Sequence, residues 1–219
     1  MINPFSLTPL KQAFNQTRHL DQGVSQVPSP ATGKSQGQST AHFVRAARLE
    51  DLSNIATLLS ESFYPADGLT SWFSPLLRLG IYQDLRGRIT TSAKHLCLVA
   101  FQGDPSLQPG RQSLAGTVEV TLRSLTPWQG SLSKYPYISN LAVKGEFRRQ
   151  GIAQHLLLTC ARSVQEWGYQ DLYLHVLEDN QAARQLYAKA GYQQERSDPT
   201  WTAYLLRQPQ RLLLRKRLK

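Results

Sequence analysis

The fold of this chain is decided by one stretch, YISNLAVKGEFRRQGIA, which occupies residues 137–153. Its first part, Tyr137 to Val143, reads as a strand, and a short polar turn follows it. From Ile152 the apolar residues recur at helical spacing, so the stretch is predicted to be a strand, a glycine-containing loop and the start of a helix. The first N–H groups of a helix have no partner within it and lie at the positive end of its dipole. Such a junction is typical of an anion-binding site.

The side chains of the loop also suit a phosphate group. Arg148 and Arg149 add positive charge, and Gly151 lets an anion approach the backbone with no Cβ in the way. Ala153 keeps the next position small. The loop has no Gly-Lys-Ser/Thr of a P-loop, and it lacks two of the three glycines of a dinucleotide-binding fingerprint. Taken alone, it fits an anion site and an ordinary strand-to-helix turn equally well.

Outward from this stretch, the chain alternates between strand-like and helix-like segments. Strands are predicted at residues 43–47, 95–101, 114–125, 135–143, 171–177, 192–196 and 211–218. Helices are predicted at residues 49–63, 71–91, 152–167 and 180–190, with Pro75 and Gly80 interrupting the second of them. The order β-α-α-β-β-β-α-β-α-β-β predicts an α/β (α+β) fold, in which helices cover the faces of a mixed sheet.

Residues 1–41 differ in composition from the rest of the chain. They are rich in Ser, Thr, Gln and Pro and contain a single acidic residue, Asp21. Such a segment buries too little apolar surface to offset chain entropy, so residues 1–41 are predicted to be a disordered N-terminal extension and residues 42–219 to be one domain. Few acids and many hydroxyls also resemble an organelle transit segment, although Arg is not enriched.

Charge and composition narrow the classes of partner. The net charge is +10, and residues 207–219 carry six Lys or Arg and no acid. A basic end can contact nucleic acid, an acidic surface or a polyanionic cofactor. The sequence has no recognition-helix or zinc-finger signature, so no nucleic acid is expected. No apolar run approaches the roughly 18 residues of a membrane span, and Cys97 and Cys160 have no metal-ligand spacing. Neither a membrane nor a metal is predicted.

Residues 137–192 resemble the GCN5-related N-acetyltransferase (GNAT) superfamily, whose pyrophosphate loop reads Arg/Gln-x-x-Gly-x-Gly/Ala. Arg148, Gly151 and Ala153 match this pattern, and Asn180 and Tyr187 match an Asn and a Tyr seven residues apart downstream. The resemblance implies a GNAT fold, a mostly antiparallel sheet of about seven strands with about four helices. It also implies acetyl-coenzyme A (acetyl-CoA) as the cosubstrate. The implied binding residues are Arg148, Arg149, Gln150, Gly151, Ile152, Ala153 and Gln154 of the loop, Leu141, Ala142 and Val143 of the preceding strand, and Asn180 and Tyr187.

The same resemblance gives roles to three side chains at the reacting group. Tyr187 is implied to donate its hydroxyl proton in a hydrogen bond to the coenzyme A sulfur. Without the resemblance, Tyr187 would be interpreted as a packed helical aromatic residue and Asn180 as a helix N-cap. The strand around His175 is similar to a eukaryotic N-terminal acetyltransferase type that reads Tyr-Leu-His-Val, and that pairs the His with a Tyr at the place of Tyr137. This implies that His175 and Tyr137 take the amine proton through water, with a His that only fills the sheet surface as the alternative. Bacterial enzymes that acetylate ribosomal-protein N-termini generally have Glu at this position. Glu119 is the second candidate base and Glu178 the third.

The acceptor is implied to bind between residues 63–92 and 197–210. These contain the aromatic residues Phe63, Tyr64, Trp72, Trp201 and Tyr204. The length of the 67–92 segment resembles plastid and cyanobacterial protein acetyltransferases, so the predicted activity is direct acetyl transfer to a protein N-terminal α-amine or a lysine. The alternatives are a small-molecule amine acceptor (a polyamine, an aminoglycoside or an amino acid) and a binding module that holds acetyl-CoA without catalysis. A monomer or weak dimer is expected, in the cytoplasm or, alternatively, the plastid stroma.

Overall fold

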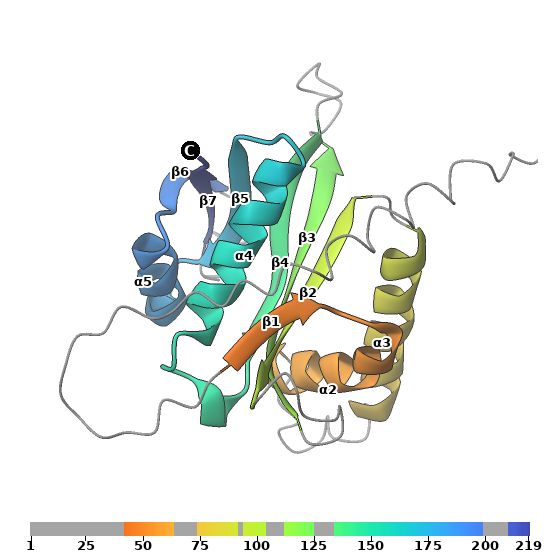
Figure 1. Cartoon of the computed structure of the whole chain (residues 1–219). Helices are drawn as coiled ribbons and strands as arrows, with labels where there is room; N and C mark the ends of the chain where they lie inside the picture. Colours follow the sequence, from red (N-terminus) through yellow and green to blue (C-terminus); the bar gives the residue numbers. More distant parts are fainter. Residues whose placement is uncertain (1–41, 64–73, 92–93, 104–111, 125–133, 199–209) are drawn as a thin grey trace, which may run out of the picture. The chain divides into compact units, whose positions relative to one another are not determined.

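The structure is a computed structural model that describes residues 42–63, 74–91, 94–103, 112–124, 134–198 and 210–219. Seven strands form one sheet in the order β1-β2-β3-β4-β5-β7-β6 (Figure 1). They are β1 (His42–Ala46), β2 (His95–Gln102), β3 (Ser113–Ser124), β4 (Lys134–Val143), β5 (Asp171–Leu177), β6 (Gln193–Asp198) and β7 (Arg211–Arg217). The helices are α2 (Leu52–Phe63), α3 (Ser74–Thr91), α4 (Ile152–Glu166) and α5 (Gln181–Lys189), with short 3-10 turns η2 (Leu49–Asp51) and η6 (Gly145–Phe147).

The pairing confirms the predicted mixed sheet. The β4–β5 pair is parallel, and the other neighbouring strands are antiparallel. The predicted extension, residues 1–41, lies outside the described residues. In the described part of the chain, no helix is both long and apolar enough to cross a membrane.

The predicted interruption of the second helix is wrong, because α3 runs without a break through Pro75 and Gly80. Pro75 is the second residue of the helix, where a missing N–H costs nothing because no acceptor within the helix is available to it. Gly80 inside a helix costs only about 1 kcal/mol relative to alanine. The first residues of the predicted segment, 71–73, lie outside the described part.

Helices cover both faces of the sheet, α4 and α5 one face and α2 and α3 the other (Figure 1). Side chains along β2 alternate between the two faces of the sheet, and each face packs under its own pair of helices. Leu98 and Ala100 pack in the core beneath α4 and α5, whereas Cys97, Val99 and Phe101 pack in the core beneath α2 and α3. Strands with both faces buried therefore read as continuous apolar runs in the sequence.

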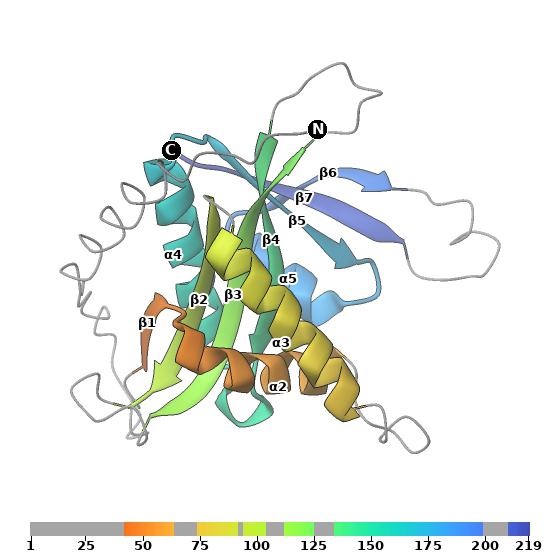
Figure 2. The same cartoon turned by 90° about the vertical axis from the view of Figure 1, so that its right-hand side faces the viewer.

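The sheet opens at β4. Thr117 pairs with Ala142 and Glu119 with Ser139, so one residue of β3 lies opposite two of β4, Asn140 and Leu141. This is a β-bulge, and Asn140 adopts the left-handed conformation with φ 53°. Farther along the sheet, β4 and β5 are paired at a single register position, Tyr137 with Tyr173. The two strands then diverge toward their carboxyl ends (Figure 2).

Candidate functional site

A cavity of about 570 Å³ lies where β4 and β5 diverge. Its described lining draws on both sides of the sheet. Val176 and Tyr187 belong to the core beneath α4 and α5, whereas Leu59 and Ile81 belong to the side covered by α2 and α3. The cavity therefore lies between the strands, and side chains from both faces of the sheet contribute to its lining.

A tyrosine and a histidine meet in this cavity. Tyr137 comes from β4 and His175 from β5, and the Tyr137 hydroxyl lies 3.0 Å from His175 Nδ1. Tyr137 is buried at 4% exposure. The register that pairs Tyr137 with Tyr173 puts His175 one step farther along the same face, since side chains on one face of a strand recur every two residues. The structure thus brings together the two residues that the sequence paired.

Tyr187 enters the cavity from the α5 side. It is 9% exposed and packs edge-to-face against Tyr192. Burial, with a smaller contribution from Tyr137, raises the pKa of Tyr187 to about 12. The hydroxyl therefore keeps its proton at neutral pH and remains able to donate a hydrogen bond.

The loop between β4 and α4 forms the predicted strand–loop–helix junction. Arg149 and Gly151 both adopt positive φ, 66° and 82°. The helix begins at Ile152, and His155 N–H donates to the Gly151 carbonyl. The N–H groups of residues 152–154 therefore have no acceptor inside the helix. Arg148 Nε donates to the Val143 carbonyl at 3.1 Å, which ties the loop to the end of β4.

Other loop residues have the exposure that an external anion requires. Arg148, Arg149, Gln150, Gly151 and Gln154 are exposed, Ala153 is half-buried, and Ile152 is buried as an anchor for the helix start. In the strand before the loop, Leu141 also lines the cavity. Strand β4 therefore links the cavity to the loop between β4 and α4, which we call the anion-type loop.

Asn180 is the N-cap of α5, as the simpler interpretation of the sequence expected. Its Oδ1 accepts a hydrogen bond from Ala183 N–H at 3.1 Å. It is not among the described residues that line the cavity. A contact from Asn180 to a bound cosubstrate stays a prediction.

The second candidate base, Glu119, is an anchored buried ion. It is fully buried, and its carboxylate accepts hydrogen bonds from Asn140 Nδ2 at 2.6 Å and Arg88 Nη1 at 3.0 Å. His95 Nε2 lies 3.0 Å from it. Burial alone would raise the pKa of Glu119, but the hydrogen bonds of His95 and Asn140 and the charge of Arg88 outweigh it and lower the pKa. A carboxylate held this way is a weak base, and its hydrogen bond to Asn140 fixes the bulge. Glu178, the third candidate, is exposed.

Several residues at the cavity were not singled out from the sequence. Asn140 was missed, although Asn within a strand run is a signal for a left-handed position. Three arginines, Arg88, Arg123 and Arg211, also line the cavity, from α3, β3 and β7. No local pattern connects three such distant positions. Of the predicted acceptor residues, Phe63 lines the cavity, whereas Tyr64, Trp72, Trp201 and Tyr204 lie outside the described residues.

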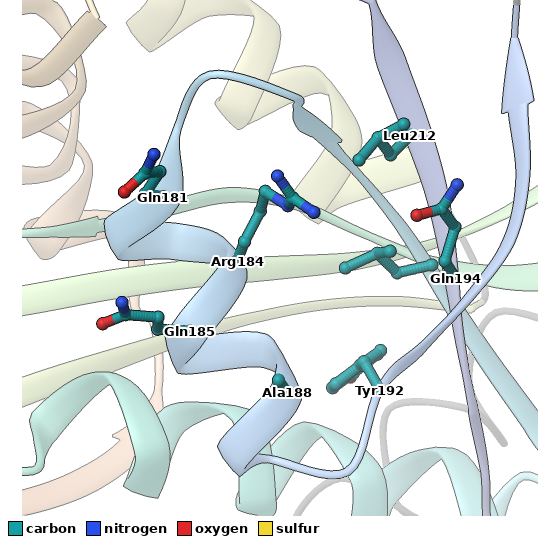
Figure 3. A pocket seen from close by; sticks show the side chains of 8 residues that line it. Gln181, Arg184, Gln185, Ala188, Tyr192, Gln194 and Leu212 are labelled. Carbon is teal, nitrogen blue, oxygen red and sulfur yellow. The ribbon is translucent and has the colours of Figure 1, made fainter.

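A second pocket of about 390 Å³ lies between α5 and the strands β6 and β7 (Figure 3). Gln181, Arg184, Gln185 and Ala188 reach it from α5, and Gln194 and Leu212 from the strands. None of the residues that line it was predicted as a site residue. In the part of the chain that the structure describes, no group of three or more His, Cys, Asp or Glu is placed to hold a metal ion.

Comparison with known proteins identifies relatives of this chain. It is 46% identical over 78 residues to GCN5-related N-acetyltransferase 7, chloroplastic, of Arabidopsis thaliana, a match that covers 36% of this chain and 28% of that protein. It is 32% identical over 192 residues to GCN5-related N-acetyltransferase 5, chloroplastic, of the same plant, covering 83% of this chain and 60% of that protein. The chain thus spans less than two thirds of the length of these two relatives.

The fold has solved counterparts. The structure of PaiA N-acetyltransferase from Thermoplasma acidophilum in complex with coenzyme A superposes with a TM-score of 0.56 at 18% identity, covering 81% of this chain and 99% of that one. The model of the acetyltransferase (GNAT) family matches residues 56–192, more than half of the sequence. That span includes the bulge, the diverging strands, the anion-type loop and Tyr187, and it shows that the chain belongs to the acetyltransferase (GNAT) family.

Proposed function

We propose that this chain is an N-acetyltransferase that moves an acetyl group from acetyl-CoA to a primary amine of a protein, at an N-terminal α-amine or a lysine side chain. The observation that carries the proposal is the cavity between β4 and β5, because its lining combines side chains from both faces of the sheet. A thioester from the α4–α5 side and an amine from the α2–α3 side can meet there. Direct attack then needs no acylated enzyme.

The donor side of this proposal rests on the loop and on β4. The N–H groups of residues 152–154 and the guanidinium of Arg149 would hold the pyrophosphate, since a helix start and fixed positive charge both favour an anion. The backbone of residues 141–143 would pair with the pantetheine amides. The pairing of β4 with β5 supports this role of the backbone. Their single register pair is Tyr137 with Tyr173, and β4 continues from there through residues 141–143 to the loop.

On the acceptor side, His175 would take the amine proton, directly or through water. A neutral imidazole has one ring nitrogen that can accept a proton, so it can act as a base. If Nε2 is the accepting atom, Nδ1 carries its proton and donates to the Tyr137 oxygen, 3.0 Å away. Tyr137 would thus orient the ring and hold its tautomer.

At the leaving group, Tyr187 would donate a hydrogen bond to sulfur. The amine nitrogen forms a bond to the carbonyl carbon, the C–S bond breaks, and the electron pair leaves on sulfur as a thiolate. A thiol has an ordinary pKa of about 8.5, well below the value of about 12 for Tyr187. Complete proton transfer from Tyr187 is therefore uphill, and its role is to stabilise the developing negative charge.

Charge separates the two classes of acceptor. Polyamines and aminoglycosides carry several positive charges, whereas the charged side chains among the described lining are three arginines and one aspartate. Asp84 is paired with Arg88. Like charges at close range disfavour a polycation, which supports a protein acceptor over these small molecules.

A screen of acceptors tests the proposal. The full chain is incubated with labelled acetyl-CoA and, in parallel, with a peptide library, polyamines and aminoglycosides, and products are identified by mass spectrometry. The proposal expects acetylated peptides. Transfer only to polyamines or aminoglycosides contradicts the protein acceptor, and acetyl-CoA binding without any transfer indicates the non-catalytic module.

The compartment is a separate part of the proposal. The chloroplastic names of the relatives support the plastid stroma over the cytoplasm.

A further inference from the structure

Positive charge gathers on the acceptor side of the cavity. On β3, Arg123 pairs in register with Tyr135, two residues from Tyr137. On β7, Arg211 pairs with Leu177, two residues from His175. Residues directly opposite each other in a sheet, and residues two apart in a strand, share a face. Both arginines therefore lie on the face of the Tyr137–His175 pair, and both line the cavity.

These two arginines differ from Arg88, the third arginine of the lining. Arg88 is in contact with two carboxylates, those of Asp84 and Glu119, so its charge is compensated. Among the described side chains, no carboxylate forms an ion pair with Arg123 or Arg211; Asp198 of β6 is paired in register with Arg211. Arg123 is held in place by stacking, with its guanidinium carbon 3.5 Å from the centre of the Tyr137 ring.

A guanidinium at the wall of a substrate cavity has two effects. It attracts a carboxylate, with which it forms charge-assisted and often bidentate hydrogen bonds. It also disfavours the ammonium form of an amine nearby, because like charges repel. The neutral form of the acceptor amine is the one that attacks a thioester, so the same charge serves binding and reaction.

We infer that Arg123 and Arg211 select acceptors that carry a carboxylate close to the reactive amine, in particular protein N-termini with Asp or Glu directly after the first residue. The inference rests on the proposed function and specifies its substrate class. Arg211 is the specificity-determining residue to test, because Arg123 also packs on Tyr137 and its replacement would disturb the catalytic pair.

The experiment compares three peptides of equal length whose N-terminal Ser is followed by Glu-Glu, Gln-Gln or Lys-Lys. Free aspartate and glutamate form a fourth arm, since they present the same chemistry as small molecules. kcat/KM is measured for the wild-type chain and for Arg211→Gln, Arg211→Lys and Arg211→Glu. Arg217→Gln is the matched control, because Arg217 is exposed on the same strand and is not among the lining residues.

The wild-type chain is expected to prefer the peptides in the order Glu-Glu, Gln-Gln, Lys-Lys. An ion pair open to solvent changes binding about two- to fivefold, so Arg211→Gln should lower the Glu-Glu to Gln-Gln ratio of kcat/KM by that factor. Arg211→Lys should keep part of the ratio, Arg211→Glu should reverse it, and Arg217→Gln should not change it. Added salt should weaken the wild-type preference.

Three results overturn the inference in different ways. Equal rates with the Glu-Glu and Gln-Gln peptides, or a ratio that Arg211→Gln leaves unchanged, remove the selection for a carboxylate while leaving N-acetyl transfer intact. Transfer to free acidic amino acids but to no peptide removes the protein acceptor. Absence of transfer to every amine refutes the proposed function itself, and the inference with it.

Discussion

Gly116 of β3 lies close against the backbone of β4, and its replacement by alanine is a sharp perturbation. A Cβ at this position would lie 2.9 Å from the Ala142 carbonyl oxygen, 3.2 Å from Val143 Cγ2 and 3.3 Å from Ile152 Cγ2. All three neighbours belong to the end of β4 or to the start of α4, on either side of the anion-type loop. The nearest atom is backbone, so the strand itself must move.

The size of the effect follows from the cost of overpacking. Extra atoms in a packed interior cost about 1–3 kcal/mol of the free energy of unfolding. For a chain of this size each kcal/mol corresponds to about 2–4 °C in Tm, so Gly116→Ala should lower Tm by roughly 2–12 °C. Because the displaced strand segment is the one proposed to pair with pantetheine, Kd for acetyl-CoA should rise as well.

Thermal unfolding and calorimetric titration with acetyl-CoA measure the two effects on one sample. Gly80→Ala is the matched control: Gly80 lies exposed in α3 with no atom within 4 Å of an added Cβ, and alanine in a helix is favoured by about 0.5–1 kcal/mol. It should raise Tm slightly and leave acetyl-CoA affinity unchanged. A Gly116→Ala chain with wild-type Tm and wild-type affinity would refute the close approach and its link to the cosubstrate.

Three further predictions concern the ionisable groups. His175→Ala should lower kcat by about 10²–10⁴-fold, with little change in acetyl-CoA affinity and with loss of the acid limb of the pH–rate profile; an unchanged profile excludes His175 as the base. Tyr187→Phe should lower kcat about tenfold or more while KM for acetyl-CoA stays within about twofold; wild-type turnover would remove Tyr187 from the mechanism. Glu119→Gln should cost about 1–3 kcal/mol of stability but retain measurable transfer, since Glu119 anchors the bulge. Because the folded-state pKa of Glu119 is lowered, its stabilisation is present above the unfolded value of about 4.3 and is lost as pH falls through the folded value. Unfolding measured between pH 2 and 6 should be less pH-dependent in Glu119→Gln than in the wild type.

The order of the helices and strands, and the strand–loop–helix junction at residues 137–153, could be predicted from the sequence alone. Periodicity and glycine positions are local properties, and α4 begins at Ile152 as they predicted. The pairing of Tyr137 with His175 came from resemblance to a known type, and the structure has the two side chains 3.0 Å apart. Only tertiary structure could bring them together, because one lies on each of two strands separated by a helix.

The features that could not be predicted from the sequence are those that depend on the register between strands. Asn140 and Glu119 are hydrogen-bonded across a bulge, and a bulge shifts which residues face each other without a change in composition. Arg123 and Arg211 meet the same cavity from β3 and β7, strands that are not neighbours in the sheet. The prediction that the helix is interrupted at Pro75 was wrong, because proline at a helix start is compatible with the helix.

The most direct measurement of the central claim, that the two substrates meet in the cavity between β4 and β5, is an initial-rate study in which acetyl-CoA and an acceptor peptide are varied together. A cavity lined from both faces of the sheet predicts a complex that holds both substrates at once, and therefore double-reciprocal lines that intersect. Parallel lines, the pattern of a ping-pong reaction through an acylated enzyme, would contradict direct attack on the thioester.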